Sequence, residues 1–92
     1  MTDEEKIEKA AIVQKYLQGL FPECDVQTKW DFDSGDLLFR IDEANGHIKH
    51  RGKFTYEFLD DTKSEDMPTE LDRRKLRSQL SKAGNNEVLI KS

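Results

Sequence analysis

Cysteine, proline and long apolar runs are scarce in this chain of 92 residues, and each absence excludes a class of protein. Cys24 is alone, so no disulfide can form within one chain, and a thiolate zinc site is not indicated. No apolar stretch approaches the roughly 20 residues that span a bilayer. The first five residues are acidic, whereas a secretory signal begins basic and then turns apolar. We therefore expect a cytoplasmic protein without membrane contact, with residues 1–92 forming one small domain.

Signatures of catalysis are also missing. The chain has no glycine-rich phosphate loop, no paired-histidine helix motif and no nucleophile elbow. His47 and His50 are three residues apart in a predicted strand, which places them on opposite faces and prevents them from sharing a metal or a proton. His50 on the inward face is typical of a core or edge histidine. We therefore expect no enzyme activity, no catalytic residue, no metal site and no cofactor.

Charge is abundant but unevenly distributed. Charged residues make up 37% of the chain and hydrophobic residues 35%, with a net charge of −4. Residues 1–45 contain 11 acids and 5 bases, whereas residues 46–92 contain 8 acids and 10 bases. An acidic balance argues against a dedicated nucleic-acid binder, whose phosphate contacts need an excess of Lys and Arg. The acidic net charge does not exclude a basic surface on one part of the molecule.

The first predicted element is a helix over residues 3–20. Thr2 and Glu5 have the spacing of a capping box, and the acidic first turn suits the helix dipole. Pro22 ends the helix. At 100° per residue one side of this helix is apolar, with Ile12 outside it. The apolar side consists of Ile7, Ala10, Val13, Leu17, Leu20 and Phe21.

After this helix, the spacing of the apolar residues changes from a period of 3.6 residues to a period of 2, which predicts strands over residues 26–32, 37–42 and 48–54. Residues 33–35 form a turn, and Asn45-Gly46 indicates a tight type I′ hairpin. The pattern favours a three-stranded antiparallel meander with one buried face. The residues predicted to point inward are Val26, Thr28, Trp30, Phe32, Leu37, Phe39, Ile41, Ile48, His50, Gly52 and Phe54, with Tyr56 included if the third strand continues.

The C-terminal half is less regular. Residues 55–61 fit either a continued strand or a helical turn capped by Thr55, and residues 60–67 form a polar, acid-rich connection. A helix over 68–82 would follow, with Pro68 in its first turn, a capping spacing from Thr69 to Asp72, and Gly84 just beyond its end. Leu71, Leu76 and Leu80 would point inward. Residues 88–90 would form a short strand, and the sequence does not indicate which strand it pairs with.

The predicted fold class is α+β, with two layers and the order α-β-β-β-α-β. A three- to four-stranded antiparallel meander would carry both helices on one face and leave the other face in water. The cations expected on the wet sheet face are Lys29, Arg40, Lys49, Arg51 and Lys53, and those of the last helix are Arg73, Arg74 and Arg77. Such clusters can hold phosphates. They also suit, and more simply, an exposed strand that must avoid stray pairing, or a helix face balanced by Glu70 and Asp72.

The order α-β-β-β-α, with the basic run 73–77 in its last helix, is similar to the double-stranded-RNA-binding domain. The likeness covers the element order and those five positions. The Gly-Pro-x-His loop of that family is replaced here by Asp33-Ser34-Gly35, the first helix is acidic, and the last strand is extra. The resemblance implies duplex-RNA binding, and no binding residue is carried over from it.

Three functions follow as hypotheses. The first is a small non-catalytic interaction module that self-associates, for example as a homodimer, or binds a protein partner. Unpaired strand edges, Ile12, Leu38 and the apolar tail at 88–90 would supply its contacts. The alternative is nucleic-acid binding, of the double-stranded-RNA type, through the basic helix and the sheet face. The third is a charge mimic that presents the acidic first helix and residues 60–66 to a basic partner.

Overall fold

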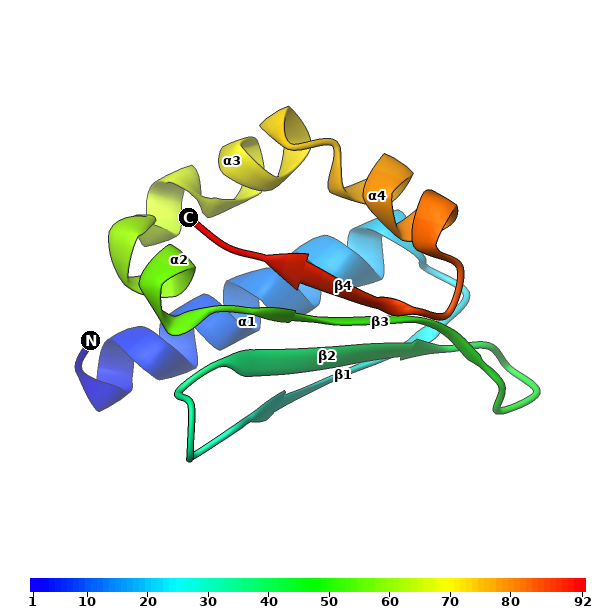
Figure 1. The fold of residues 1–92 in the computed structure, drawn as a ribbon, viewed down its shortest axis with the longest axis horizontal. Coiled ribbons are helices and arrows are strands. Elements are labelled where there is room, and N and C mark those ends of the chain that lie inside the picture. Colours follow the sequence, from blue (N-terminus) through cyan, green and yellow to red (C-terminus); the bar gives the residue numbers. More distant parts are fainter.

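The structure, a computed structural model, describes residues 1–92 as an α+β fold built on one four-stranded sheet. Figure 1 shows the helices on one side of this sheet, with α3 and α4 above β4 and α1 behind the strands. The helices are α1 (Asp3–Leu20), α2 (Tyr56–Asp61), α3 (Met67–Arg73) and α4 (Leu76–Ala83), with a 3₁₀ turn at Ser64–Asp66. The strands are β1 (Asp25–Trp30), β2 (Leu37–Asp42), β3 (Ile48–Phe54) and β4 (Glu87–Ile90).

Helix α1 begins and ends where the sequence predicts. The Thr2 side chain accepts a hydrogen bond from the Glu5 amide, and the Glu5 carboxylate accepts one from the Thr2 amide, which confirms the capping box. Val13 and Leu17 are fully buried as expected. Ile7, however, was wrongly assigned to the buried face: it is 70% exposed, because the first turns of α1 extend beyond the sheet. Ile12 packs partly against the core instead.

The first three strands form the predicted antiparallel meander. β1 pairs with β2 and β2 with β3, so that Phe39 lies opposite Thr28 on one side and Gly52 on the other. Leu37, Phe39, Ile41, His50, Gly52 and Phe54 all point into the core as expected. Two of the residues predicted to point inward do not: Ile48 is exposed at the hairpin end of β3, and Phe32 lies beyond the end of β1.

The β2–β3 hairpin is not a type I′ turn. Gly46 has φ +86°, but Asn45 does not have positive φ. The Gly46 amide donates to the Glu43 carbonyl and the Glu43 amide donates to the His47 carbonyl. This is the arrangement of a type I turn followed by a left-handed glycine, in which only the glycine needs positive φ.

The C-terminal helices differ from the predicted single helix over 68–82. The ambiguous segment at 55–61 is helical: Thr55 caps α2 by accepting from the Phe58 amide. The expected polar connection at 60–67 is largely helical: α2 continues to Asp61, a 3₁₀ turn covers Ser64–Asp66, and α3 begins without a Thr69 cap at Met67, which is fully buried. The long helix breaks at Lys75, which adopts left-handed backbone with φ 56°. Gly84 ends α4 as predicted.

The last strand overturns the all-antiparallel expectation. β4 pairs with β3 in parallel, and the sheet order is β1-β2-β3-β4, so the sheet is mixed. The chain leaves β3 at Phe54, passes through all three C-terminal helices and returns alongside the strand it left (Figure 1). A parallel neighbour requires such a crossover because the chain must come back to the same end of the sheet.

The core lies between the sheet and the helices. Its largest members include Phe54 and Phe58, whose rings pack with their centroids 5.9 Å apart. Leu71, Leu76 and Leu80 are buried as predicted. None of the helices combines the length and apolar character that a membrane crossing would need.

Candidate interaction surface

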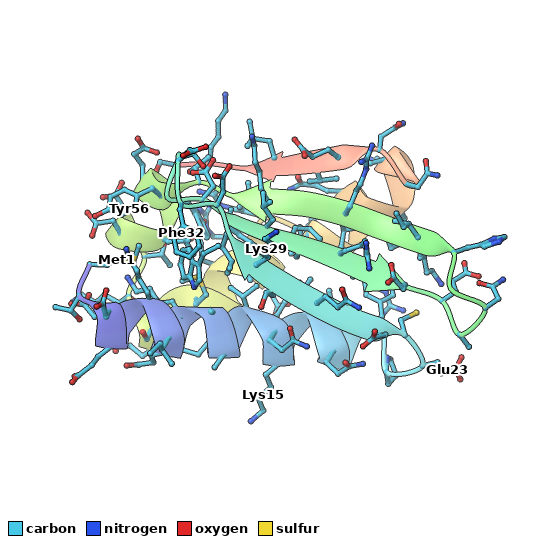
Figure 2. All side chains as sticks on the ribbon, turned by 90° about the horizontal axis from the view of Figure 1, so that it is seen from below. Met1, Lys15, Glu23, Lys29, Phe32 and Tyr56 are labelled. Carbon is cyan, nitrogen blue, oxygen red and sulfur yellow. The ribbon has the colours of Figure 1, made fainter.

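The face of the sheet opposite the helices is open, and two rows of side chains cross it. Because neighbouring strands are in register, side chains on one face line up across the sheet. The first row consists of Gln27, Arg40, Arg51 and Glu87, and the second of Lys29, Leu38, Lys53 and Leu89. Figure 2 looks onto this face, with Lys29 extending from β1. We call these eight side chains the open face.

Arg40 and Arg51 are direct cross-strand partners at the centre of the open face. Like charges in this position destabilise a sheet. Arg40 Nε lies 3.0 Å and 3.2 Å from the two carboxylate oxygens of Asp42, and its Nη2 donates to Gln27. Arg51 Nε donates to the Asn85 carbonyl at 3.0 Å. These contacts direct the Arg40 guanidinium toward β1 and the Arg51 guanidinium toward the turn between α4 and β4, and only Arg40 has a carboxylate among them.

The open face is slightly hollowed. A shallow depression of about 490 Å³ runs across β1, β2 and β3, between Lys29 and Glu87. Arg40 and Arg51 line it together with Leu38. The depression thus combines two guanidiniums, a lysine and an apolar side chain at one place, which suits a partner carrying carboxylates or phosphates beside apolar groups.

Lys49 is a predicted member of this cationic face that makes a different contact. Its ammonium lies 5.6 Å from the ring centroid of Phe21, the residue that caps α1. Phe21 also packs against the buried ring of His50, at a centroid distance of 5.1 Å. His50 Nδ1 donates to the Gly84 carbonyl at 2.8 Å, so this histidine is a hydrogen-bonded core residue.

The basic run at 73–77 does not form one cationic strip. The break at Lys75 places Arg73 and Arg74 at the end of α3 and Arg77 in α4. Glu70 accepts from both Arg73 and Arg74, with N–O distances of 2.6 Å, and these bonds hold the Glu70 pKa below its usual value. Arg74 also lies over the Phe58 ring and donates to the Lys91 carbonyl.

The two predicted halves of a nucleic-acid footprint therefore lie apart. The open face is on one side of the sheet, whereas α3 and α4 lie on the other side (Figure 1). One rod of nucleic acid cannot lie flat on both. Of the three predicted helix cations, Arg77 is the one with no hydrogen bond or ion pair in the structure. The helices therefore offer a single unpaired guanidinium to a phosphate.

Phe32 is an exposed surface residue that the alternation of apolar residues in the sequence predicts to be buried. It was expected to point into the core with Trp30, but β1 ends at Trp30 and Phe32 is 95% exposed in the following loop. Trp30 itself packs partly against the core. Figure 2 shows Phe32 at the end of the molecule that also holds Met1 and Tyr56, beside the open face. Phe32 and Leu38 line one hollow of about 420 Å³.

The loop that carries Phe32 is internally hydrogen bonded. The Asp31 amide donates to the Asp36 carbonyl, the Gly35 amide donates to the Asp31 carbonyl, and the Asp33 amide donates to Asp31 Oδ1. The hydrogen bond from the Asp33 amide, followed by that from the Ser34 side chain, holds the Asp31 pKa below its usual value. Asp36 in turn accepts from the Tyr56 amide at 2.9 Å. Hydrogen bonds therefore hold both ends of the loop in place, and the Phe32 side chain extends into solvent from a hydrogen-bonded backbone.

Other unusual polar groups have structural partners. Lys9 is buried and donates to the Leu59 carbonyl at 2.5 Å, which ties α1 to α2. The Tyr16 hydroxyl donates to Asp72 at 2.6 Å, and burial together with the Asp72 carboxylate raises the Tyr16 pKa well above its usual value. No three His, Cys, Asp or Glu side chains are grouped so that they could hold a metal ion.

Comparison with known proteins found no match to a family, to a curated protein or to a solved structure.

Proposed function

We propose that the chain is a non-catalytic interaction module whose open face binds an acidic, partly apolar surface of a protein. The observation that carries the proposal is the placement of Arg40 and Arg51 as cross-strand partners beside the alternating row of Lys29, Leu38, Lys53 and Leu89. Four cations and two leucines on one flat face favour a partner with carboxylates spaced between apolar groups.

Nucleic acid is the less favoured occupant of this face. Single strands are usually held by stacking bases on aromatic side chains within a cationic groove. No aromatic side chain belongs to the open face, and Phe32 stands at its end. Duplex RNA would need a long stripe of free cations. Arg73 and Arg74 are already bound to Glu70 on the far side of the sheet.

The proposal is tested by titrating ¹⁵N-labelled protein with an acidic peptide in which Glu and Leu alternate, and by following the amide shifts. A Lys-Leu peptide of the same length is the matched probe. We expect shifts centred on β1, β2 and β3 with the acidic peptide alone. Single-stranded and duplex RNA oligonucleotides are titrated in parallel, and tighter binding of either RNA at the open face would overturn the choice of a protein partner.

Variants locate the contact. Arg40→Glu with Arg51→Glu keeps a like-charged cross-strand pair but also places new carboxylates beside Asp42 and Glu87, so circular dichroism is used first to verify that the variant folds. The peptide affinity is expected to fall about tenfold or more, since two charge contacts become repulsive. Arg77→Glu with Lys82→Glu makes the same change of net charge on α4 and should leave the affinity within about twofold. Equal losses in both variants would mean that net charge, and not this face, determines binding.

A further inference from the structure

The exposed ring of Phe32 has the properties of a binding anchor. Aromatic side chains supply much of the energy of protein interfaces, and burial is worth roughly 25 cal/mol per Å² of apolar surface. Phe32 is 95% exposed, and its backbone is held by the hydrogen bonds of the Asp31–Asp36 loop. An anchor that is already ordered loses little conformational freedom when it binds.

The surroundings of Phe32 indicate what it would contact. Asp31 and Asp33 flank it in sequence, and Asp3 lines the neighbouring hollow with Ile7 and a single cation, Lys6. An acidic rim around an apolar tip is complementary to an apolar surface between cations. This chain carries such a surface, since Leu38 and Leu89 alternate with Lys29 and Lys53 across the open face.

The two complementary patches adjoin each other. Phe32, Asp33, Lys29 and Leu38 line the same hollow, so the acidic tip ends where the cationic row begins. When two complementary patches lie side by side, a two-fold axis running between them pairs each patch with the other patch of a second copy. The contact between the acidic tip and the cationic row is then made twice, once in each direction, and the assembly closes at two chains.

We propose that a second copy of this chain occupies the open face, with Phe32 of each copy on Leu38 and Leu89 of the other. Asp33 of each copy lies opposite Lys29 and Lys53 of its partner copy. This inference rests on the proposed function, because it names the acidic partner that the open face receives. It explains how a chain with four cations on this face can pair with itself: each copy brings its own acids to the contact.

The size of the face sets the strength of the pairing. Four strands at about 4.8 Å and six residues at about 3.3 Å make a rectangle of roughly 19 by 20 Å. The resulting area of about 400 Å², increased by the Phe32 loop, falls below the roughly 800 Å² that each partner buries in a standard interface. We expect a weak dimer that forms at tens to hundreds of micromolar.

Sedimentation equilibrium from 10 µM to 1 mM tests the dimer. We expect the mass to rise from 10.7 kDa toward twice that value, with weaker association at 0.5 M salt than at 0.02 M salt. Phe32→Ser should weaken association at least tenfold, whereas Ile48→Ser removes an exposed apolar side chain at the hairpin end of β3 and should not. Both side chains are exposed enough for the fold to survive, which circular dichroism verifies.

A charge exchange gives the decisive result. The Lys29→Glu/Lys53→Glu variant and the Asp33→Lys variant should each be monomeric alone, because each brings like charges together. Mixed in equal amounts they should form a heterodimer, since both contacts are again between opposite charges. Self-association of either variant at wild-type strength, or a mixture that stays monomeric, would overturn the inference.

The failure of this inference can be told from failure of the proposed function. A wild-type chain that stays monomeric at 1 mM but binds the Glu-Leu peptide on β1, β2 and β3 would refute the second copy and retain the acidic partner. A chain that dimerises without any effect of Phe32→Ser or of the charge exchange would also refute the inference. A chain that neither dimerises nor binds the peptide refutes both.

Discussion

Gly52 is the glycine at which an added side chain would meet its neighbours most closely, and Gly52→Ala tests that packing. A Cβ built at Gly52 would lie 2.4 Å from the Val88 carbonyl oxygen and 2.7 Å from two atoms of the Phe39 ring. Real Cβ atoms do not approach oxygen or carbon that closely, so β4 must move away from β3 and the Phe39 ring must also shift from its position between β1 and β3. Overpacking of this kind costs about 1–3 kcal/mol. Because backbone and ring are both affected, we expect the upper end, about 3 kcal/mol.

The assay is urea denaturation followed by circular dichroism. With a slope of about 2 kcal/mol per M, a loss of 3 kcal/mol lowers the midpoint by about 1.5 M. Gly19→Ala is the matched control, since Gly19 lies in α1 and a Cβ there meets nothing within 4 Å. Alanine in a helix should raise the free energy of unfolding by about 0.5–1 kcal/mol. A midpoint for Gly52→Ala within 0.25 M of wild type would refute the packing described for β3 and β4.

Two other predictions concern the contacts between helices. Lys9→Ala removes the bond to the Leu59 carbonyl and leaves a gap between α1 and α2, so it should lower the free energy of unfolding by about 2 kcal/mol, whereas exposed Lys15→Ala should change it by less than about 0.5 kcal/mol. Equal effects in the same urea assay would contradict the role given to Lys9. The Tyr16 pKa is raised from its usual 10.0, so the folded state favours the neutral phenol. The stability that this bond contributes is complete below pH 10 and declines as the pH rises above 10. Thermal unfolding between pH 8 and pH 11 should show a steeper alkaline decline for wild type than for Tyr16→Phe, and parallel curves would exclude the Tyr16–Asp72 bond as the cause.

Local patterns predicted the elements whose determinants are close in sequence. The capping residues of α1 predicted where that helix begins, and the alternation in β2 and in residues 50–54 of β3 predicted the buried side chains, because these stretches present one continuous face to the core. Ile7 and Ile48, near the ends of α1 and β3, were the exceptions. The same alternation failed at Phe32. It continues past Trp30, but the Asp31 side chain accepts the Asp33 amide and turns the chain out of the strand. The cluster Asp33-Ser34-Gly35 indicated a turn, which could have been extended back to Asp31.

The broken C-terminal helix depends on side chains that are distant in sequence. Leu71 and Leu76 are five residues apart and would lie about 140° apart on a single helix, so one straight helix cannot bury both. The left-handed residue at Lys75 reorients α4, and Met67, Leu71, Leu76 and Leu80 all reach the core. The parallel pairing of β4 could not be predicted either, because nothing within residues 87–90 selects β3 over another edge.

The candidate surface was predictable in part. The sequence identified Lys29, Arg40, Arg51 and Lys53 as side chains of the face away from the helices, and the structure places them there. It could not show that Glu70 engages Arg73 and Arg74, because that depends on where the helix ends. Nor could it show that Phe32 lies outside the core, which is the observation on which the proposed pairing with a second copy depends.

The return of β4 to the side of β3 has a consequence for the order of folding. The pairs among β1, β2 and β3 join neighbours in the chain and can form early, as in any hairpin. β4 can add only after α2, α3 and α4 have brought the chain back, so its registration with β3 closes a long loop. Folding molecules should therefore pass through an intermediate in which β1, β2 and β3 are paired while Val88 and Ile90 are still exposed to solvent. Aggregation between chains is expected to be most pronounced in this intermediate.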